Sequence, residues 1–147
     1  MTTLNPASVV FEDASSNPIV VSAANPLPTA VGTATSGGLS ISYATLANSN
    51  NATSVKASAG QVYFVRAFNN STTIAYLKFY NKASAPTPAS DTVVDKFMIP
   101  ASSGVIHSIT AGIPFSTGIA YAVVTGIGDT DNTSVAASAY SVTVGYK

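Results

Sequence analysis

Few side chains in this sequence could carry out chemistry, and their spacing does not bring them together. His107 is the only histidine and there is no cysteine, so local spacing cannot assemble a zinc site. In an extended strand Ser108 would point to the opposite side from His107, which argues against a serine–histidine nucleophile pair. We interpret His107 as a structural or edge residue.

The acidic residues also provide no acid–base pair. Asp129 and Asp131, in the segment DTDNTS, are spaced like the first ligands of a calcium loop, but the glycine and the bidentate glutamate of an EF-hand are missing. We expect a turn whose carboxylates bond to the local backbone. Asp91 lies in a proline-containing loop and Asp95 directly precedes Lys96, so they are not paired. The sequence therefore predicts no enzyme activity, no metal and no cofactor.

The low charge of the chain limits its partners. Only 8% of the 147 residues are charged, with six basic and six acidic side chains, whereas about a quarter is usual. The basic residues are scattered singly, so neither nucleic acid nor a membrane surface is an expected partner. The first apolar runs are too short for a signal peptide. A near-neutral surface favours close association with other proteins, although a free protein with a Ser/Thr-rich surface is an equally good interpretation.

Tyrosine provides the strongest binding hypothesis, because exposed aromatic rings can stack on sugars. Most of the seven tyrosines occupy positions that we expect to pack in a core or interface: Tyr63, Tyr76, Tyr80, Tyr121 and Tyr140. There is no tryptophan. An exposed cluster would favour sugar binding, and burial would disfavour it, for the four tyrosines that test the hypothesis: Tyr43, Tyr121, Tyr140 and Tyr146.

The elements that position these residues are strands. Residues 60–81 contain most of the large apolar side chains, with Asn-Asn-Ser-Thr in the middle, and predict a central β-hairpin. Residues 140–146 alternate as in a strand with one solvent-facing side. Further strands are predicted over 39–46, 53–57, 93–99, 105–110 and 119–125, and loops over 82–91, 111–118 (with Phe115 buried) and 126–133.

No segment has helical periodicity over three turns. About eight short strands with regular turn signals predict an all-β fold, an antiparallel β-sandwich that is jelly-roll-like. Strand count alone does not exclude an immunoglobulin-like order. The sandwich domain is expected over residues 39–147.

Residues 1–38 are expected to form an extended N-terminal arm, because they contain four prolines and no sustained apolar alternation. Short edge strands fit only near residues 9–11 and 19–21. The arm either packs on its own domain or docks on a neighbouring subunit, where it would add short strands to a sheet edge. The predicted partner-binding residues are its small apolar clusters: Val9, Val10, Phe11, Ile19, Val20 and Val21.

Three blocks of the sequence resemble small virion proteins of tailed bacteriophages: SAGQVY (58–63), AYLKFYNKA (75–83) and GIPFSTGIA (112–120). The resemblance covers roughly residues 58–147, and the segment NPLPT (25–29) adds a weaker similarity. Within that group, the size and β content are similar to capsid decoration or cement proteins. These contain no catalytic residue to carry over.

The resemblance implies a structural protein on the outer surface of the capsid head of the virion. It would bind the major capsid protein, clamp neighbouring capsid subunits, and form a homodimer or homotrimer. The alternative is a carbohydrate- or receptor-binding module of a phage tail fibre or similar appendage, because the same sandwich fold also hosts lectins.

Overall fold

The computed structural model describes residues 11–12, 18–19 and 38–147, and every regular element in them is a β-strand. The chain divides into two units, Met1–Ser36 and Gly37–Lys147. In the first unit, β1 (Phe11–Glu12) pairs antiparallel with β2 (Pro18–Ile19), with Phe11 opposite Ile19. The other four predicted partner-binding residues, Val9, Val10, Val20 and Val21, lie outside the described residues.

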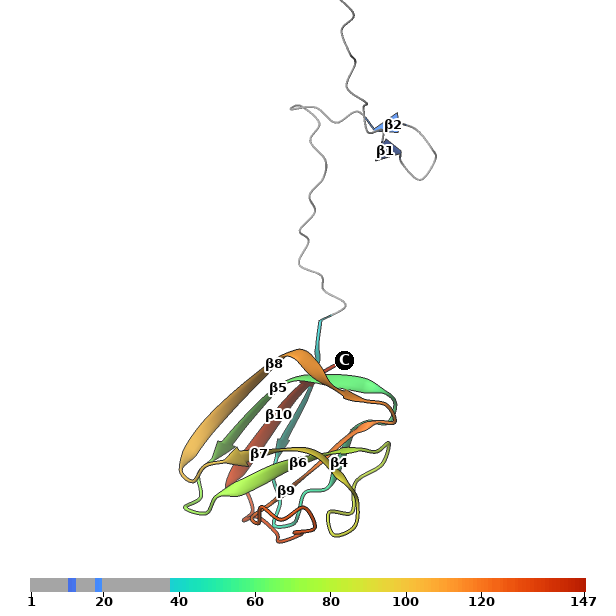
Figure 1. Cartoon of the computed structure of the whole chain (residues 1–147). Helices are drawn as coiled ribbons and strands as arrows, with labels where there is room; N and C mark the ends of the chain where they lie inside the picture. Colours follow the sequence, from blue (N-terminus) through green and yellow to red (C-terminus); the bar gives the residue numbers. More distant parts are fainter. Residues whose placement is uncertain (1–10, 13–17, 20–37) are drawn as a thin grey trace, which may run out of the picture. The chain divides into compact units, whose positions relative to one another are not determined.

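The second unit is an antiparallel sandwich of two four-stranded sheets (Figure 1). Its strands are β3 (Ser40–Thr45), β4 (Thr53–Lys56), β5 (Gly60–Asn69), β6 (Ala75–Asn81), β7 (Val93–Ile99), β8 (Ser103–Phe115), β9 (Ile119–Val124) and β10 (Tyr140–Tyr146). One sheet has the order β3-β10-β5-β8 and the other the order β4-β9-β6-β7. The all-β sandwich predicted from the sequence is confirmed.

The strand order is that of a jelly roll. β6 pairs with β7, β5 with β8, β4 with β9 and β3 with β10, so the chain pairs with itself as one long nested hairpin. Pairing of β10 with β5 and of β9 with β6 then joins the strands into two sheets. This nesting differs from the strand pairing of an immunoglobulin sandwich.

The hairpin predicted over residues 60–81 is wrong. β5 and β6 belong to different sheets, so the segment between them carries the chain from one layer to the other. Buried Asn69 holds this corner: its amide donates to the Thr73 and Ile99 carbonyls and accepts from the Ser71 N–H. Both strands are central in their own sheets, as expected. Turn residues indicate where the chain changes direction. They do not determine whether the next strand joins the same sheet or the other one.

The core lies between the sheets and is organised around Phe79. The Phe79 ring centroid lies 6.0 Å from that of Phe97, 5.9 Å from Phe115 and 6.4 Å from Tyr121, in edge-on or tilted arrangements. Such aromatic pairs stabilise a core beyond the area that they bury. Phe115 is buried as predicted.

The loop predicted over residues 111–118 is partly wrong, because β8 continues to Phe115. Its pairing with β5 is interrupted: Ser108 lies opposite Phe64 and Ile113 opposite Val62, so residues 109–112 form a bulge, in which Ile109 still packs against the core. Gly112, with φ of +72°, supplies the left-handed backbone that this bulge needs. Gly112 lies in the segment predicted as a loop, and in the structure it lies at a bulge within β8.

β10 is also more enclosed than its alternation suggested. It lies between β3 and β5, and its outward-facing Thr143 and Gly145 are buried together with its inward-facing valines. The prediction of a solvent-facing side is therefore wrong for this strand. Neighbouring side chains on both flanking strands are larger than Thr and Gly, and they shield it.

Candidate interaction surface

The outward face of the β4-β9-β6-β7 sheet is largely covered. Tyr80, Ala120 and Ala122 form a small second core there, packed against Ala52 and Val93. Pro86 and Pro88, in the loop between β6 and β7, are buried as well. This side of the sandwich therefore has its own apolar layer.

The loop of residues 125–133 lies over the same face and is held by Lys78. The Lys78 ammonium donates to the Gly128 carbonyl and, at 3.1 Å, to the Asp131 carbonyl. Burial lowers the pKa of Lys78, and the negative charge of Asp131 partly offsets this effect. The side chain is fully buried, so its charge serves to hold the loop.

Of the two aspartates of this loop, Asp131 bonds to the local backbone as predicted, whereas Asp129 does not. The Asp131 carboxylate accepts from the Gly126 and Thr133 N–H groups and the Thr133 hydroxyl. Asp129 forms an ion pair with Lys96 at 2.6 Å. Within the residues that the structure describes, no group of three His, Cys, Asp or Glu could hold a metal ion.

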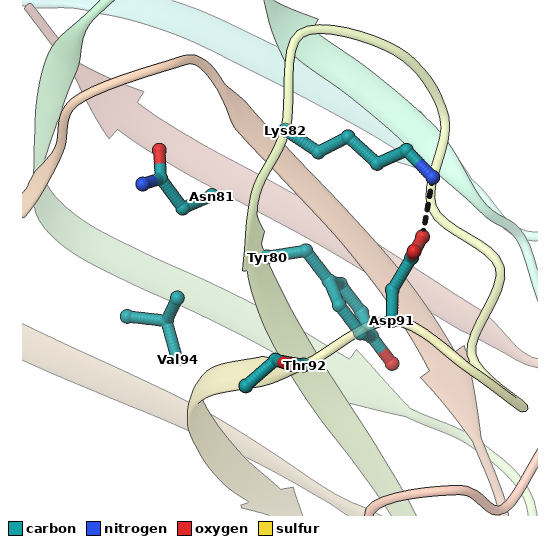
Figure 2. A pocket seen from close by; sticks show the side chains of 6 residues that line it. All are labelled: Tyr80, Asn81, Lys82, Asp91, Thr92 and Val94. Atoms are coloured by element: carbon teal, nitrogen blue, oxygen red, sulfur yellow. Dashed lines mark hydrogen bonds and ion pairs between the residues drawn. The ribbon is translucent and has the colours of Figure 1, made fainter.

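A hollow of about 420 Å³ lies where the 82–92 loop meets β6 (Figure 2). Lys82 and Asp91 point toward each other across it and form an ion pair at 2.6 Å. The Lys82 side chain, and then the Thr87 N–H, lower the pKa of Asp91 by hydrogen bonding to it. The Asn81 side chain points to the other side of β6 from Tyr80, and its amide oxygen accepts a hydrogen bond from the Thr117 N–H.

Besides the exposed Thr92, the remaining polar group of this hollow is the Tyr80 hydroxyl. It is buried from solvent and has no hydrogen-bond partner among the described residues. Burial, reinforced by the charge of Asp91, raises its pKa to about 12. Because the Tyr80 oxygen is inaccessible and Lys82 and Asp91 already pair with each other, the hollow offers a ligand no free charge, and its accessible uncharged groups include the exposed Thr92.

His107 and Ser108 lie on opposite sides of β8. The His107 ring is half-buried and stacks on Phe97 with 4.8 Å between ring centroids, whereas Ser108 is exposed. The Nε2 atom of His107 is buried without a partner in the described part of the chain. These positions provide no serine–histidine pair.

The outward face of the β3-β10-β5-β8 sheet, here called the exposed sheet face, has no covering loop among the described residues. Four large apolar side chains on it are more than half exposed: Ile41 (56%), Tyr43 (65%), Phe68 (53%) and Ile106 (71%). The strand register arranges the face in three rows across the sheet: Thr45-Ser141-Phe68-Gly104, Tyr43-Thr143-Arg66-Ile106 and Ile41-Gly145-Phe64-Ser108.

Size differences between neighbouring strands shape this face. The outward residues of central β10 are Ser141, Thr143 and Gly145, all small, and the flanking strands carry larger side chains. The Phe64 ring lies over Gly145 and occupies the space that a Cβ would need there. Small residues in one column therefore leave depressions between larger ones.

Two hollows flank Phe68. One, of about 260 Å³, is bordered by Tyr43 and Ser141 on the β10 side. The other, of about 300 Å³, lies between Arg66 and Ile106 over Gly104 on the β8 side. Each is large enough to admit an apolar side chain from a partner.

Arg66 is the only charged residue in the three rows. Its guanidinium donates to the Thr143 hydroxyl at 3.4 Å. No carboxylate in the described residues forms an ion pair with it, whereas Lys82 and Lys96 are paired. The exposed sheet face thus combines apolar side chains with a single cation that lacks a described counter-charge.

The four test tyrosines do not form an exposed cluster. Tyr43 is exposed, Tyr146 is half-buried, and Tyr121 and Tyr140 are buried. Sequence reasoning did not identify Phe68, Ile106 or Arg66 as surface residues. The available signal was Arg66, since a charge within an apolar strand marks the outward side, and Phe68 shares that side.

The described residues include no helix that could cross a membrane. In comparisons with known proteins, no family model, no curated protein and no solved structure matches this chain.

Proposed function

We propose that this protein is a structural virion protein of a tailed bacteriophage that binds the outer surface of the head and stabilises contacts between major capsid subunits. The observation that carries the proposal is the exposed sheet face. Contiguous apolar surface on a soluble protein marks a site of protein association. Loops and a small apolar layer cover much of the corresponding face of the opposite sheet, where Val94 and Met98 of β7 remain exposed, so the larger group of exposed apolar side chains lies on the exposed sheet face.

The mechanical demands of a clamp agree with this geometry. A specific protein contact of standard size buries about 1,600 Å² in total. A face carried by four paired strands over a packed core is already ordered, so little conformational entropy is lost on binding. Near-zero net charge permits close packing of many copies in a lattice. The resemblance of three sequence blocks to phage virion proteins indicates which lattice.

The second candidate is a carbohydrate- or receptor-binding module of a phage tail fibre or appendage. The observation that favours it is Tyr43, whose exposed ring borders a hollow together with the hydroxyl-bearing Thr45 and Ser141. Phe68 adds a second exposed ring at this hollow, but the buried Tyr121 and Tyr140 do not extend the two rings into the cluster of exposed tyrosines that the hypothesis required. We therefore place this function second.

Capsid binding is the direct test. Purified protein is added to expanded heads that lack it, and binding is measured by co-sedimentation and cryo-electron microscopy. We expect saturable binding, density on the outer surface that bridges capsid subunits, and release of packaged DNA at a higher temperature. A Phe68→Ser/Ile106→Ser variant should bind at least tenfold more weakly.

The matched control is Met98→Ser, because Met98 is 52% exposed but lies on β7 of the other sheet. It should bind like the unchanged protein. Density at the tail or its fibres would instead support the receptor-binding module and call for a glycan screen. Absence of binding to any part of the virion would contradict both functions.

A further inference from the structure

We propose that the exposed sheet face is the docking site for residues 9–13 of the N-terminal arm of a second copy of this chain. The inference deepens the proposed function by naming the occupant of the face. The inference rests on the proposed function only where it places the associated copies on a capsid, because the association between copies itself requires no capsid.

The shape of the face suits an extended segment with apolar side chains. The hollows on either side of Phe68 lie over β10 and β8, which flank β5. Strand spacing puts them roughly 10 Å apart, whereas side chains two residues apart, which share one face of an extended chain, leave the backbone about 7 Å apart, so the side chains must splay to fill both hollows. The segment Val-Val-Phe-Glu-Asp at 9–13 provides three apolar side chains within that length.

The opposite charges of the arm and of the sandwich domain also favour this segment as the occupant of the exposed sheet face. Residues 1–37 contain Glu12 and Asp13 and no Lys, Arg or His, so the arm carries a formal charge of −2. Residues 38–147 contain six basic and four acidic side chains, a formal charge of +2. The two carboxylates directly follow the apolar run, as Arg66 directly borders the apolar hollow. A carboxylate can accept two parallel hydrogen bonds from a guanidinium.

The same charges argue against direct packing of two exposed sheet faces. Such a pairing would bury two Arg66 side chains and provide no carboxylate from either face. A second copy's arm supplies both the apolar contact and the counter-charge. With Phe11 and Ile19 paired, the 20 residue steps from Ile19 to Leu39 can extend at most roughly 70 Å, enough to reach a neighbouring molecule.

A charge swap in the full-length protein tests the proposal. Association is measured by sedimentation velocity and light scattering over a concentration series at low salt. We expect the unchanged protein to form a species of two or more copies, and Arg66→Glu to weaken association at least tenfold. Glu12→Arg/Asp13→Arg should weaken it similarly. Combining all three substitutions should restore association to within about threefold, because the ion pair is rebuilt with reversed polarity.

Two matched controls accompany the swap. Lys147→Glu makes the same charge change at an exposed position away from the three rows, and should leave association unchanged. Phe68→Ser should weaken association, and Met98→Ser on the other sheet should not. Circular dichroism of each variant verifies that it is folded.

Several results would overturn the proposal. These are a monomer at all concentrations, association that persists in both Arg66→Glu and Phe68→Ser, and failure of the combined variant to recover. If the charge variants changed the frictional ratio while the mass stayed that of a monomer, the arm would dock on its own chain. That result would contradict docking on a second copy. A monomer that still binds heads through this face refutes the inference alone. Charge-coupled association without head binding refutes the proposed function alone.

Discussion

Single residues show which polar groups hold the fold and which are available to a partner. Lys78 and Asp131 both bond to a loop of their own chain, and Lys82 and Asp91 pair with each other. Arg66 has only a long bond to Thr143. Polar side chains that are already satisfied contribute to stability, whereas Arg66 retains most of its five donors for another molecule.

The Tyr80 hydroxyl provides a test of stability at this scale. A buried hydroxyl without a partner gains nothing from hydrogen bonding, so we expect Tyr80→Phe at pH 8 to leave the free energy of unfolding unchanged or raise it by up to about 1 kcal/mol. Urea unfolding measures this. Tyr140→Phe is the control, since the Tyr140 hydroxyl donates to the Thr73 carbonyl at 2.9 Å and its loss should cost about 1 kcal/mol.

The same variant should change the response to alkali. The pKa of Tyr80 is raised from 10.0 to about 12 in the folded protein. The hydroxyl therefore ionises first in the unfolded chain, and the stability it contributes is complete below pH 10 and lost as pH rises toward 12. Tyr80→Phe should lose less stability than the unchanged protein over this interval. Equal losses would show that the hydroxyl is not shielded.

At the scale of elements, the two sheets differ in what covers them. Two loops fold over the outer side of the β4-β9-β6-β7 sheet. Lys78 holds the loop of residues 125–133, and the Lys82–Asp91 pair holds the loop of residues 82–92. The β3-β10-β5-β8 sheet has short outward residues on β10 and large ones around them. Loops of the same chain therefore cover much of the first sheet, where Val94 and Met98 stay exposed, and the second is the one that we propose to bind another chain.

Gly118 tests how closely the elements are packed where β4, β6 and β9 meet. A Cβ on Gly118 would lie 2.7 Å from the Ala83 Cα, 2.7 Å from the Lys82 carbonyl oxygen and 2.8 Å from that of Lys56. These backbone atoms cannot rotate away. We expect Gly118→Ala to lower the free energy of unfolding by about 1–3 kcal/mol in urea titrations.

The control for this substitution is Gly128→Ala. A Cβ on Gly128 meets no atom within 4 Å, so the change should stay within about 0.5 kcal/mol. If Gly118→Ala left the free energy of unfolding unchanged, the strand ends would be able to separate without a cost in stability. An equally large loss in both variants would indicate a general sensitivity to alanine instead of local crowding.

At the scale of the whole molecule, folding and association are assigned to different parts of the chain. The main core of the described residues draws only on side chains between Ala44 and Tyr146. The proposed contact between copies uses the arm and the exposed sheet face. We therefore expect that the proposed association can be lost without loss of the fold.

Deletion of residues 1–37 tests this separation. We expect the truncated protein to unfold within a few degrees of the full chain at low concentration, because its core is intact. Its self-association should fall at least as far as that of Arg66→Glu, and head binding should weaken. Calorimetry and sedimentation velocity measure the two properties. A truncated protein that does not fold, or that associates as before, would contradict the assignment.

The sequence by itself determined the strands and the class of fold. Alternating and aromatic-rich segments predicted β7 and β10 with the bounds that the structure has, and Phe115 was correctly placed in the core. These features follow from local chemistry, since turn residues, β-branched side chains and period-two patterns act over a few neighbouring positions. The local backbone bonds of Asp131 were predicted for the same reason, whereas the ion pair of Asp129 with the distant Lys96 was not.

Only the tertiary structure decided which strands pair and which face stays exposed. Thr45 of β3 lies opposite Ser141 of β10, far along the chain, and no local pattern encodes that register. In β5 the charge of Arg66 marks the outward side that Phe68 shares, but only the placed neighbours show that no loop among the described residues covers Phe68 there. Exposure is a property of what covers a residue, and covering loops come from distant parts of the chain.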